Sequence, residues 1–142
     1  MRALGAAGWL RYCVPAAHGG ALEALDSRAL CVARETLAYH DGLADFAFAM
    51  QGLGSGAITL AGSDAQKARW LPAIARGELR LQSMGVTEPT TGTDTTKIKT
   101  TAVKKGDRYV INGQKVWISR IQHSDLMILL ARTTPLADVK KK

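Results

Sequence analysis

Two short stretches of this sequence carry residue types that suit ligand chemistry. The first, "GVTEPTTGTD" at residues 85–94, gathers threonines, acids, a proline and a glycine where the chain must reverse. Pro89 favours an extended Glu88, and Gly92 can adopt the positive φ that a reversal needs. The backbone N–H groups around this glycine would then form an anion-binding nest, with the Thr93 hydroxyl as a further phosphate donor. An ordinary crossover loop with self-capping threonines explains the same residues, and their spacing alone favours that simpler interpretation.

The second stretch, "QKVWISR" at residues 114–120, places a serine two positions after a tryptophan. It follows Asn112-Gly113, and Asn-Gly between alternating residues is the strongest short signal for a β-hairpin. The resulting register sets Trp117 and Ser119 on the charged face of the hairpin. The opposite face, predicted to be the core, holds Tyr109, Ile111, Val116 and Ile118. A flat ligand with polar edges is therefore expected to cover the tryptophan.

The remaining residues with ligand chemistry show no pattern of this kind. The three histidines are far apart and are expected at the surface or in turns: His18, His40 and His123. They do not have the spacing of a metal site. Cys13 and Cys31 have neither metal nor redox spacing and are expected to be buried free thiols in a reducing compartment.

Composition limits the class of protein. The chain has 142 residues, of which 46% are hydrophobic and 6% aromatic, and its net charge is +7. Residues 97–142 carry eleven Lys and Arg against three Asp and Glu, whereas residues 1–96 are close to neutral. A nucleic-acid surface is disfavoured because the basic residues are not interleaved with aromatic ones on one face. A solvated basic face that meets a phosphorylated small molecule fits better. The longest apolar runs are too short to span a membrane, and the first residues resemble mature chain rather than a signal peptide.

Helical patterns fill the first half of the chain. Apolar residues at helical spacing predict a helix over 26–40 with Asp26 as its N-cap. A second helix over 43–53 is nearly free of charge and is expected to be buried on most sides, before a break at residues 54–56. Ser63 and Gln66 form a capping box for a third helix, which Gly77 ends.

Strand patterns fill the second half. The sequence predicts strands near 80–86, 100–104, 108–111, 114–119 and 126–132. Those between 100 and 132 are expected to form an antiparallel meander whose last strand lacks a partner. Gly106-Asp107 and Asn112-Gly113 are the predicted turns. The fold class is therefore α+β, with an all-α domain over 1–79 followed by part of an antiparallel β-barrel over 80–142.

The order of these motifs resembles the acyl-CoA dehydrogenase family over nearly the whole chain. "VTEPTTGTD", "KGDRYVINGQKVWIS" and "LLART" resemble the central signature of that family. "VPAAHGG" and "GSDAQKARWLPAIARGE" resemble its earlier motifs. The resemblance in motif order is more specific than the spacing that suggested an ordinary crossover loop. It therefore favours a ligand site at residues 85–94.

The resemblance implies a flavoprotein oxidoreductase of fatty acid metabolism that uses FAD. It takes a proton and a hydride from adjacent carbons of an acyl-CoA thioester. The matching positions imply that Val86 and Thr87 lie along the flavin pyrimidine edge and that Thr93 contacts the pyrophosphate and lies close to the substrate. Trp117 is implied to cover the isoalloxazine, with Ser119 near its reactive nitrogen. Gly92, Ile118 and Met84 complete the expected cofactor-binding set, although the family often has an aromatic residue where Met84 stands.

The resemblance also implies what lies elsewhere. Family members are more than twice as long and carry their catalytic glutamate in a helical bundle that follows the barrel. We expect no catalytic residue in this chain, because Glu23, Glu35 and Glu78 fall in the helical half and the family uses Glu88 structurally. The implied partners are acyl-CoA, an electron-transfer flavoprotein or similar acceptor, and further copies in a dimer or tetramer. The expected compartment is the cytoplasm of a bacterium or the mitochondrial matrix. The alternative is a non-catalytic remnant of the same fold that serves protein association.

Overall fold

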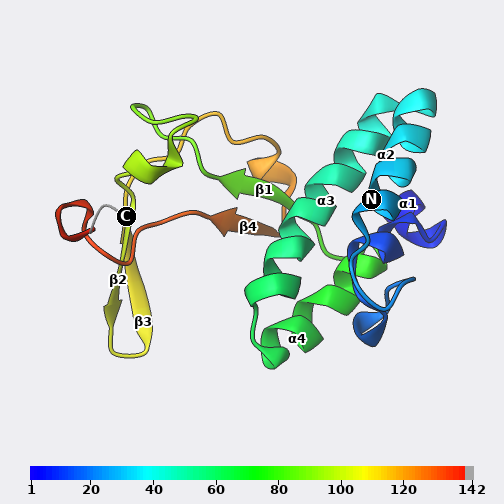
Figure 1. Cartoon of the computed structure of the whole chain (residues 1–142), viewed down its shortest axis with the longest axis horizontal. Coiled ribbons are helices and arrows are strands. Elements are labelled where there is room, and N and C mark those ends of the chain that lie inside the picture. Colours follow the sequence, from blue (N-terminus) through cyan, green and yellow to red (C-terminus); the bar gives the residue numbers. More distant parts are fainter. Residues whose placement is uncertain (140–142) are drawn as a thin grey trace. The chain divides into compact units, whose positions relative to one another are not determined.

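The computed structural model describes residues 1–139. Helices fill the first half of the chain and strands the second (Figure 1), which confirms the predicted α+β class. Two compact units are present. The first contains Met1–Ser83 and Arg120–Met127, and the second contains Met84–Ser119 and the residues from Ile128 onward.

The first unit contains four α-helices: α1 (Arg2–Ala6), α2 (Ser27–His40), α3 (Gly42–Ala61) and α4 (Asp64–Ala75). Short 3-10 helices occur at Trp9–Cys13, Ala16–His18 and Ile121–His123. The predicted first helix is confirmed, since the Asp26 carboxylate accepts hydrogen bonds from the backbone N–H groups of Arg28 and Ala29 at 2.8 and 3.2 Å. The capping box of Ser63 and Gln66 is also present at the start of α4. Among residues 1–139, no helix is both long and apolar enough to cross a membrane.

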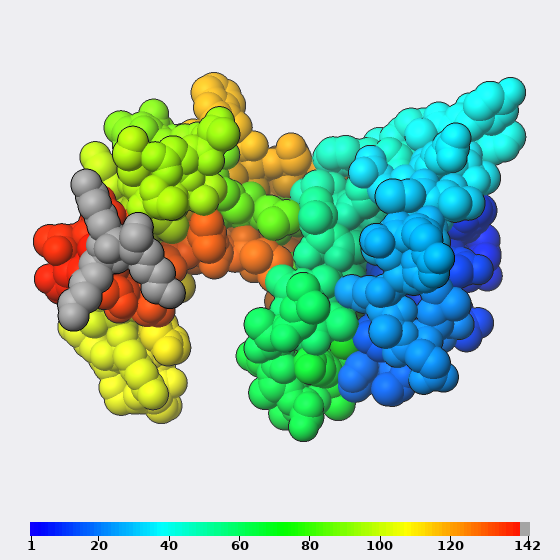
Figure 2. Space-filling model, in the orientation of Figure 1, coloured from blue at the N-terminus to red at the C-terminus, as the bar shows by residue number. Residues whose placement is uncertain are grey.

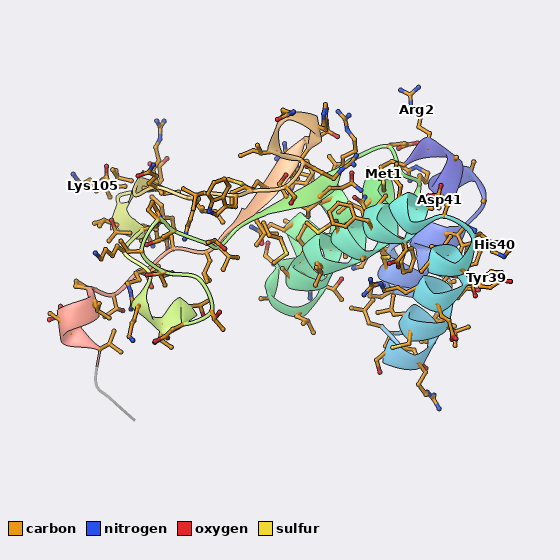
Figure 3. All side chains as sticks on the ribbon, turned by 90° about the horizontal axis from the view of Figure 1, so that it is seen from above. Met1, Arg2, Tyr39, His40, Asp41 and Lys105 are labelled. Atoms are coloured by element: carbon orange, nitrogen blue, oxygen red, sulfur yellow. The ribbon has the colours of Figure 1, made fainter. Side chains whose placement is uncertain are left out.

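A single residue separates α2 from α3. Tyr39, His40 and Asp41 mark this corner, where they are labelled in Figure 3. Asp41 ends α2 and caps α3, because its carboxylate accepts from the N–H groups of Leu43 and Ala44. The two helices then lie side by side, as the adjoining cyan and green surfaces in Figure 2 show.

The predicted break in α3 is wrong, because the helix runs unbroken from Gly42 to Ala61. Its small residues serve close packing instead of a turn. A Cβ added to Gly54 would lie 2.4 Å from the Leu81 side chain. The Ser55 hydroxyl donates to the Cys13 carbonyl at 2.9 Å. The small side chains therefore let neighbouring segments approach the helix backbone.

The buried face of α3 also differs from the predicted one. Its buried residues are Ala47, Phe48, Gln51, Gly54 and Ser55. Leu43 and Leu53, which were expected inside, are exposed, so the helix is not buried on most sides. The buried glutamine explains the difference, because it satisfies backbone groups of the segment after α4. The Gln51 amide donates to the Leu79 carbonyl at 2.7 Å and accepts from the Leu81 N–H at 3.1 Å.

Four strands follow: β1 (Leu81–Gly85), β2 (Thr101–Lys105), β3 (Arg108–Asn112) and β4 (Leu126–Leu129). β1 pairs with β4, and β2 pairs with β3 in an antiparallel hairpin. The hairpin turns at Gly106-Asp107, as predicted, with Lys105 opposite Arg108 at its tip. Lys105 is labelled in Figure 3. The expected meander is wrong, since β4 was predicted to lack a partner and instead pairs with β1.

The predicted strand over 114–119 is absent, and so is the Asn-Gly hairpin on which its register depended. Close packing explains the glycine. A Cβ at Gly113 would lie 2.2 Å from the Thr100 hydroxyl oxygen, so this position needs glycine for the approach of two segments. β3 pairs with β2, and the chain beyond Gly113 runs toward residues 86–88 instead of folding back on β3.

Candidate functional site

The threonine-rich turn is closed by Glu88 and Thr91. The Glu88 N–H donates to the Thr91 carbonyl at 2.8 Å, and the Thr91 N–H donates to the Glu88 carbonyl at 3.2 Å. Gly92 follows this reversal and does not adopt a positive φ, so the predicted role for that glycine is wrong. The Thr91 N–H already donates to the Glu88 carbonyl, so only backbone N–H groups from Gly92 onward could bind an anion. The exposed Thr93 is the first hydroxyl beyond the closed turn.

Glu88 is a buried carboxylate of the second unit that accepts several hydrogen bonds. Its oxygens accept from the backbone N–H groups of Lys99 and Thr100 at 2.6 and 2.9 Å. They also accept from the ammonium of Lys115 at 3.0 Å, and the two side chains are only 4% and 8% exposed. Burial raises the pKa of this carboxyl, but hydrogen bonding from Thr100, Lys99 and Lys115 outweighs that effect and lowers the pKa to about 2.

Lys115 makes a second contact that joins the two motif stretches. Its ammonium donates to the Val86 carbonyl at 2.9 Å as well as to Glu88. The neighbouring Val116 N–H donates to the Thr87 carbonyl at 3.0 Å. Three consecutive residues of the first stretch are thus bonded to two consecutive residues of the second. Residues 86–88 and 115–116 therefore lie side by side.

The tryptophan next to this junction faces solvent. The Trp117 side chain is 89% exposed, the largest exposed fraction among the exposed large hydrophobic residues of 1–139. Its φ is 59°, in the left-handed region that bulky side chains rarely adopt. Arg120 has a similar φ of 60°. A large aromatic surface held on an unusual backbone is typical of a ligand site.

The residues predicted from strand parity are placed differently. Tyr109 and Ile111 were expected in a core, yet they are 56% and 51% exposed on β3. Trp117 and Ser119 do not share a strand face, because residues 114–119 form no strand. Their proximity to the first stretch comes from Lys115 and Val116 instead.

The other residues predicted to bind the cofactor differ in how exposed they are. Met84, Val86, Thr87 and Ile118 are half-buried, whereas Gly92, Thr93 and Ser119 are exposed. The structure brings residues 86–87 next to the segment that carries residues 117–119. Lys115 is the residue that sequence reasoning missed, since its bonds to Val86 and Glu88 join segments far apart in the sequence. The available signal in the sequence was a single lysine between the glycine at 113 and the three apolar residues 116–118.

These residues fit a flavin. An exposed aromatic surface follows directly on the segment bonded to residues 86–87, and an exposed hydroxyl lies just beyond the turn that Glu88 closes. A Cβ at Gly92 would meet no atom within 4 Å, so the space around that turn is open. A tricyclic ring with a phosphate tail needs surfaces of these kinds.

The acids give no poised general base. Glu23, Glu35 and Glu78 are exposed residues of the first unit, and Glu78 pairs with Arg76 at 2.7 Å. Glu88 is ionised far below neutral pH and its oxygens already accept several hydrogen bonds. A general base works best with a pKa near the operating pH.

The histidines and cysteines lie apart from these contacts. His40 and His123 are exposed and His18 is half-buried. Within residues 1–139, no group of three possible metal ligands gathers. Cys13 is buried, and burial raises the pKa of its thiol to about 12. Cys31 is exposed on the outer side of α2, so the prediction of two buried thiols is wrong for this residue.

Comparison with known proteins gives the same family for both halves. Residues 1–78 match the family described as acyl-CoA dehydrogenase, N-terminal domain, and residues 83–142 match acyl-CoA dehydrogenase, middle domain. Acyl-CoA dehydrogenase FadE26 of Mycobacterium tuberculosis is 49% identical over 81 residues, which are 57% of this chain and 20% of that protein.

Solved structures resemble the chain over almost its whole length. The acyl-CoA dehydrogenase from Geobacillus kaustophilus has 35% identity and a TM-score of 0.76, covering 94% of this chain and 34% of that one. The acyl-CoA dehydrogenase complexed with FAD from Bacillus anthracis has 32% identity and a TM-score of 0.80, covering 93% and 23%. The chain thus spans between 20% and 34% of the length of these proteins.

Proposed function

The chain belongs to the acyl-CoA dehydrogenase family, and on that premise we propose that it supplies the flavin-binding part of an FAD-dependent acyl-CoA dehydrogenase. The reaction is the α,β-dehydrogenation of an acyl-CoA thioester. Bound FAD would accept the hydride that leaves the β-carbon. The general base that takes the α-proton is expected outside this chain, since its acids are exposed, paired or already ionised and bonded.

One observation supports this proposal most directly. The exposed Trp117 follows two residues that are bonded to the backbone of Val86 and Thr87. Trp117 would stack on the isoalloxazine, and the backbone at Val86 and Thr87 would line its pyrimidine edge. Stacking an aromatic ring against a flat ligand buries a large area and adds a favourable offset geometry.

The other proposed contacts follow from position. Thr93 and the N–H groups near Gly92 would bind the pyrophosphate, and Thr93 would also lie near the thioester. Ser119 and Ile118 would reach the reactive edge of the ring, while Met84 would pack at its rim. An acyl-CoA substrate, an electron-transfer flavoprotein or similar acceptor, and a homo-oligomer complete the proposal for the whole protein.

The test is the absorbance of the purified chain after incubation with FAD and removal of the free cofactor. We expect resolved flavin bands at a stoichiometry of one per chain. Replacing Thr93 by valine should weaken retention, because the hydroxyl donor is lost while the side-chain volume is kept. A chain that retains no flavin at millimolar FAD would contradict the proposal.

Turnover provides a separate check on the assignment of the base. Acyl-CoAs of several lengths are mixed with the chain, FAD and an artificial electron acceptor. We expect little dehydrogenation, because loss of a general base typically slows a reaction about 10²- to 10⁴-fold. Stoichiometric, rapid turnover would contradict the assignment and would direct attention back to Glu88.

A further inference from the structure

Lys115 and Glu88 form a junction between three segments that carry the proposed flavin contacts. Glu88 closes the threonine turn through its backbone bonds with Thr91. Its carboxylate also binds the N–H groups of Lys99 and Thr100, just before β2. The ammonium of Lys115 completes the junction by bonding both this carboxylate and the Val86 carbonyl.

Regular secondary structure does not position the tryptophan segment. In the described part of the chain, residues 114–119 belong to no helix or strand. The bonds from Lys115 and Val116 to residues 86–88 hold this segment against the first stretch at the two residues that precede Trp117. Because Trp117 comes directly after Val116, a shift at these bonds moves its ring relative to Val86 and Thr87.

The chemistry of the pair favours a role in geometry over one in stability. A buried ion pair replaced by apolar residues of similar volume often leaves a protein equally stable or more stable, since the desolvation penalty disappears. Apolar contacts have no fixed direction, whereas each bond of an ammonium or a carboxylate has a preferred angle. The pair thus provides direction that an apolar pair would lack.

We propose that Glu88 and Lys115 are positioning residues, which hold the backbone at 86–87 and the ring of Trp117 in the register that flavin binding requires. This inference rests on the proposed function. Neither residue is assigned a contact with the cofactor. Both act through Val86, Thr87 and Trp117.

The decisive variant is the double substitution Glu88→Leu with Lys115→Met, which removes the directional bonds and leaves no unpaired buried charge. Its melting temperature is expected to fall, because the Lys99 and Thr100 N–H groups and the Val86 carbonyl lose their partners, so binding is measured well below the melting transition. Its Kd for FAD, measured by flavin fluorescence, is expected to rise at least about tenfold. The visible circular dichroism of bound flavin should change as well, because that signal reports the surroundings of the ring. Lys104→Met, an exposed lysine on β2, is the matched control and should stay within about twofold in Kd.

A readout without flavin completes the test. The Val116 amide should exchange with solvent faster in the double variant, because its bond to the Thr87 carbonyl depends on the position of the neighbouring residue. Equal Kd, equal dichroism and equal exchange in a folded double variant would overturn the positioning role alone. If the unaltered chain binds no FAD, the proposed function fails first, and the role in flavin binding fails with it.

Discussion

The carboxylate of Glu88 and the ammonium of Lys115 lie 3.0 Å apart in the interior of the second unit, although 27 positions separate them in the sequence. The same ammonium reaches the Val86 carbonyl at 2.9 Å. One buried cation therefore fixes the distance between the threonine turn and the tryptophan segment. Several properties of the protein should depend on this contact.

The first is the response of stability to acid. The pKa of Glu88 lies at about 2 in the folded chain against an ordinary value of 4.5. A carboxyl with a lowered pKa stabilises the folded state above its unfolded pKa, and that contribution is lost as the pH falls through the folded pKa. We therefore expect the free energy of unfolding to fall between pH 4.5 and about 2. Glu88→Gln should reduce this slope in urea titrations across the range.

Asp125 provides the internal comparison, because the Arg80 guanidinium and N–H lower the pKa of its carboxyl to about 2 as well. Part of the acid slope should therefore remain in Glu88→Gln. Glu35→Gln, at an exposed position of α2, should leave the slope unchanged. An acid profile of Glu88→Gln that matches the unaltered chain would contradict the assignment.

The second property is stability at neutral pH. Lys115→Met should lower the free energy of unfolding by about 3–5 kcal/mol, because it leaves the Glu88 carboxylate buried without its cation. Lys97→Met removes an ion pair with Asp94 in which both side chains are largely exposed, and should cost less than about 1 kcal/mol. Chemical denaturation at pH 7 measures both values. Equal losses in the two variants would show that Lys115 is not an effectively buried partner.

The helical half of the fold was largely predictable from local signals. Asp26, Ser63 and Gln66 lie in helix caps. The hydrogen bonds of these caps join residues at most three positions apart, so the local sequence was enough to predict them. The break predicted at Gly54 was wrong because the glycine responds to Leu81, which is distant in the sequence. A local pattern cannot distinguish a glycine needed for a turn from one needed for close packing.

A third prediction concerns the buried glutamine that joins α3 to the start of β1. Gln51→Leu should lower the free energy of unfolding by about 2–3 kcal/mol, because it leaves the Leu79 carbonyl and the Leu81 N–H without this partner. Gln122→Leu, at an exposed position, is the control and should change stability little. Urea titration measures both. A neutral effect of Gln51→Leu would mean that water or another group replaces the amide.

The fourth prediction is association through the outer side of α3. Leu53 and Leu60 are 55% and 82% exposed on this helix, and contiguous exposed apolar surface favours self-association. Light scattering of the chain should therefore rise with concentration in the micromolar range.

The double substitution Leu53→Lys with Leu60→Lys should suppress that rise. Gln122→Lys with Thr133→Lys adds the same charge at exposed polar positions and should suppress it less. If both double variants scatter alike, net charge and not the apolar surface of α3 controls association.

The site was predictable in part. Motif order identified Thr93, Trp117 and their neighbours as candidates, but the Asn-Gly hairpin and its parity argument were wrong. Gly113 packs on Thr100, and β3 pairs with β2, so the segment beyond Gly113 approaches residues 86–88 instead. The pairing of Glu88 with Lys115 depends on contacts across 27 positions, which no local spacing rule predicts.

The central claim, that flavin binds against Trp117, is tested most directly by tryptophan emission during FAD titration. The chain has three tryptophans, and Trp9 and Trp70 lie in the first unit. We expect saturable quenching at one FAD per chain, most of which disappears in Trp117→Phe and remains in Trp70→Phe. Because Trp117 is 89% exposed, its replacement should leave the melting temperature nearly unchanged. Quenching that is unsaturable, or that is equal in Trp117→Phe and the unaltered chain, would contradict the claim.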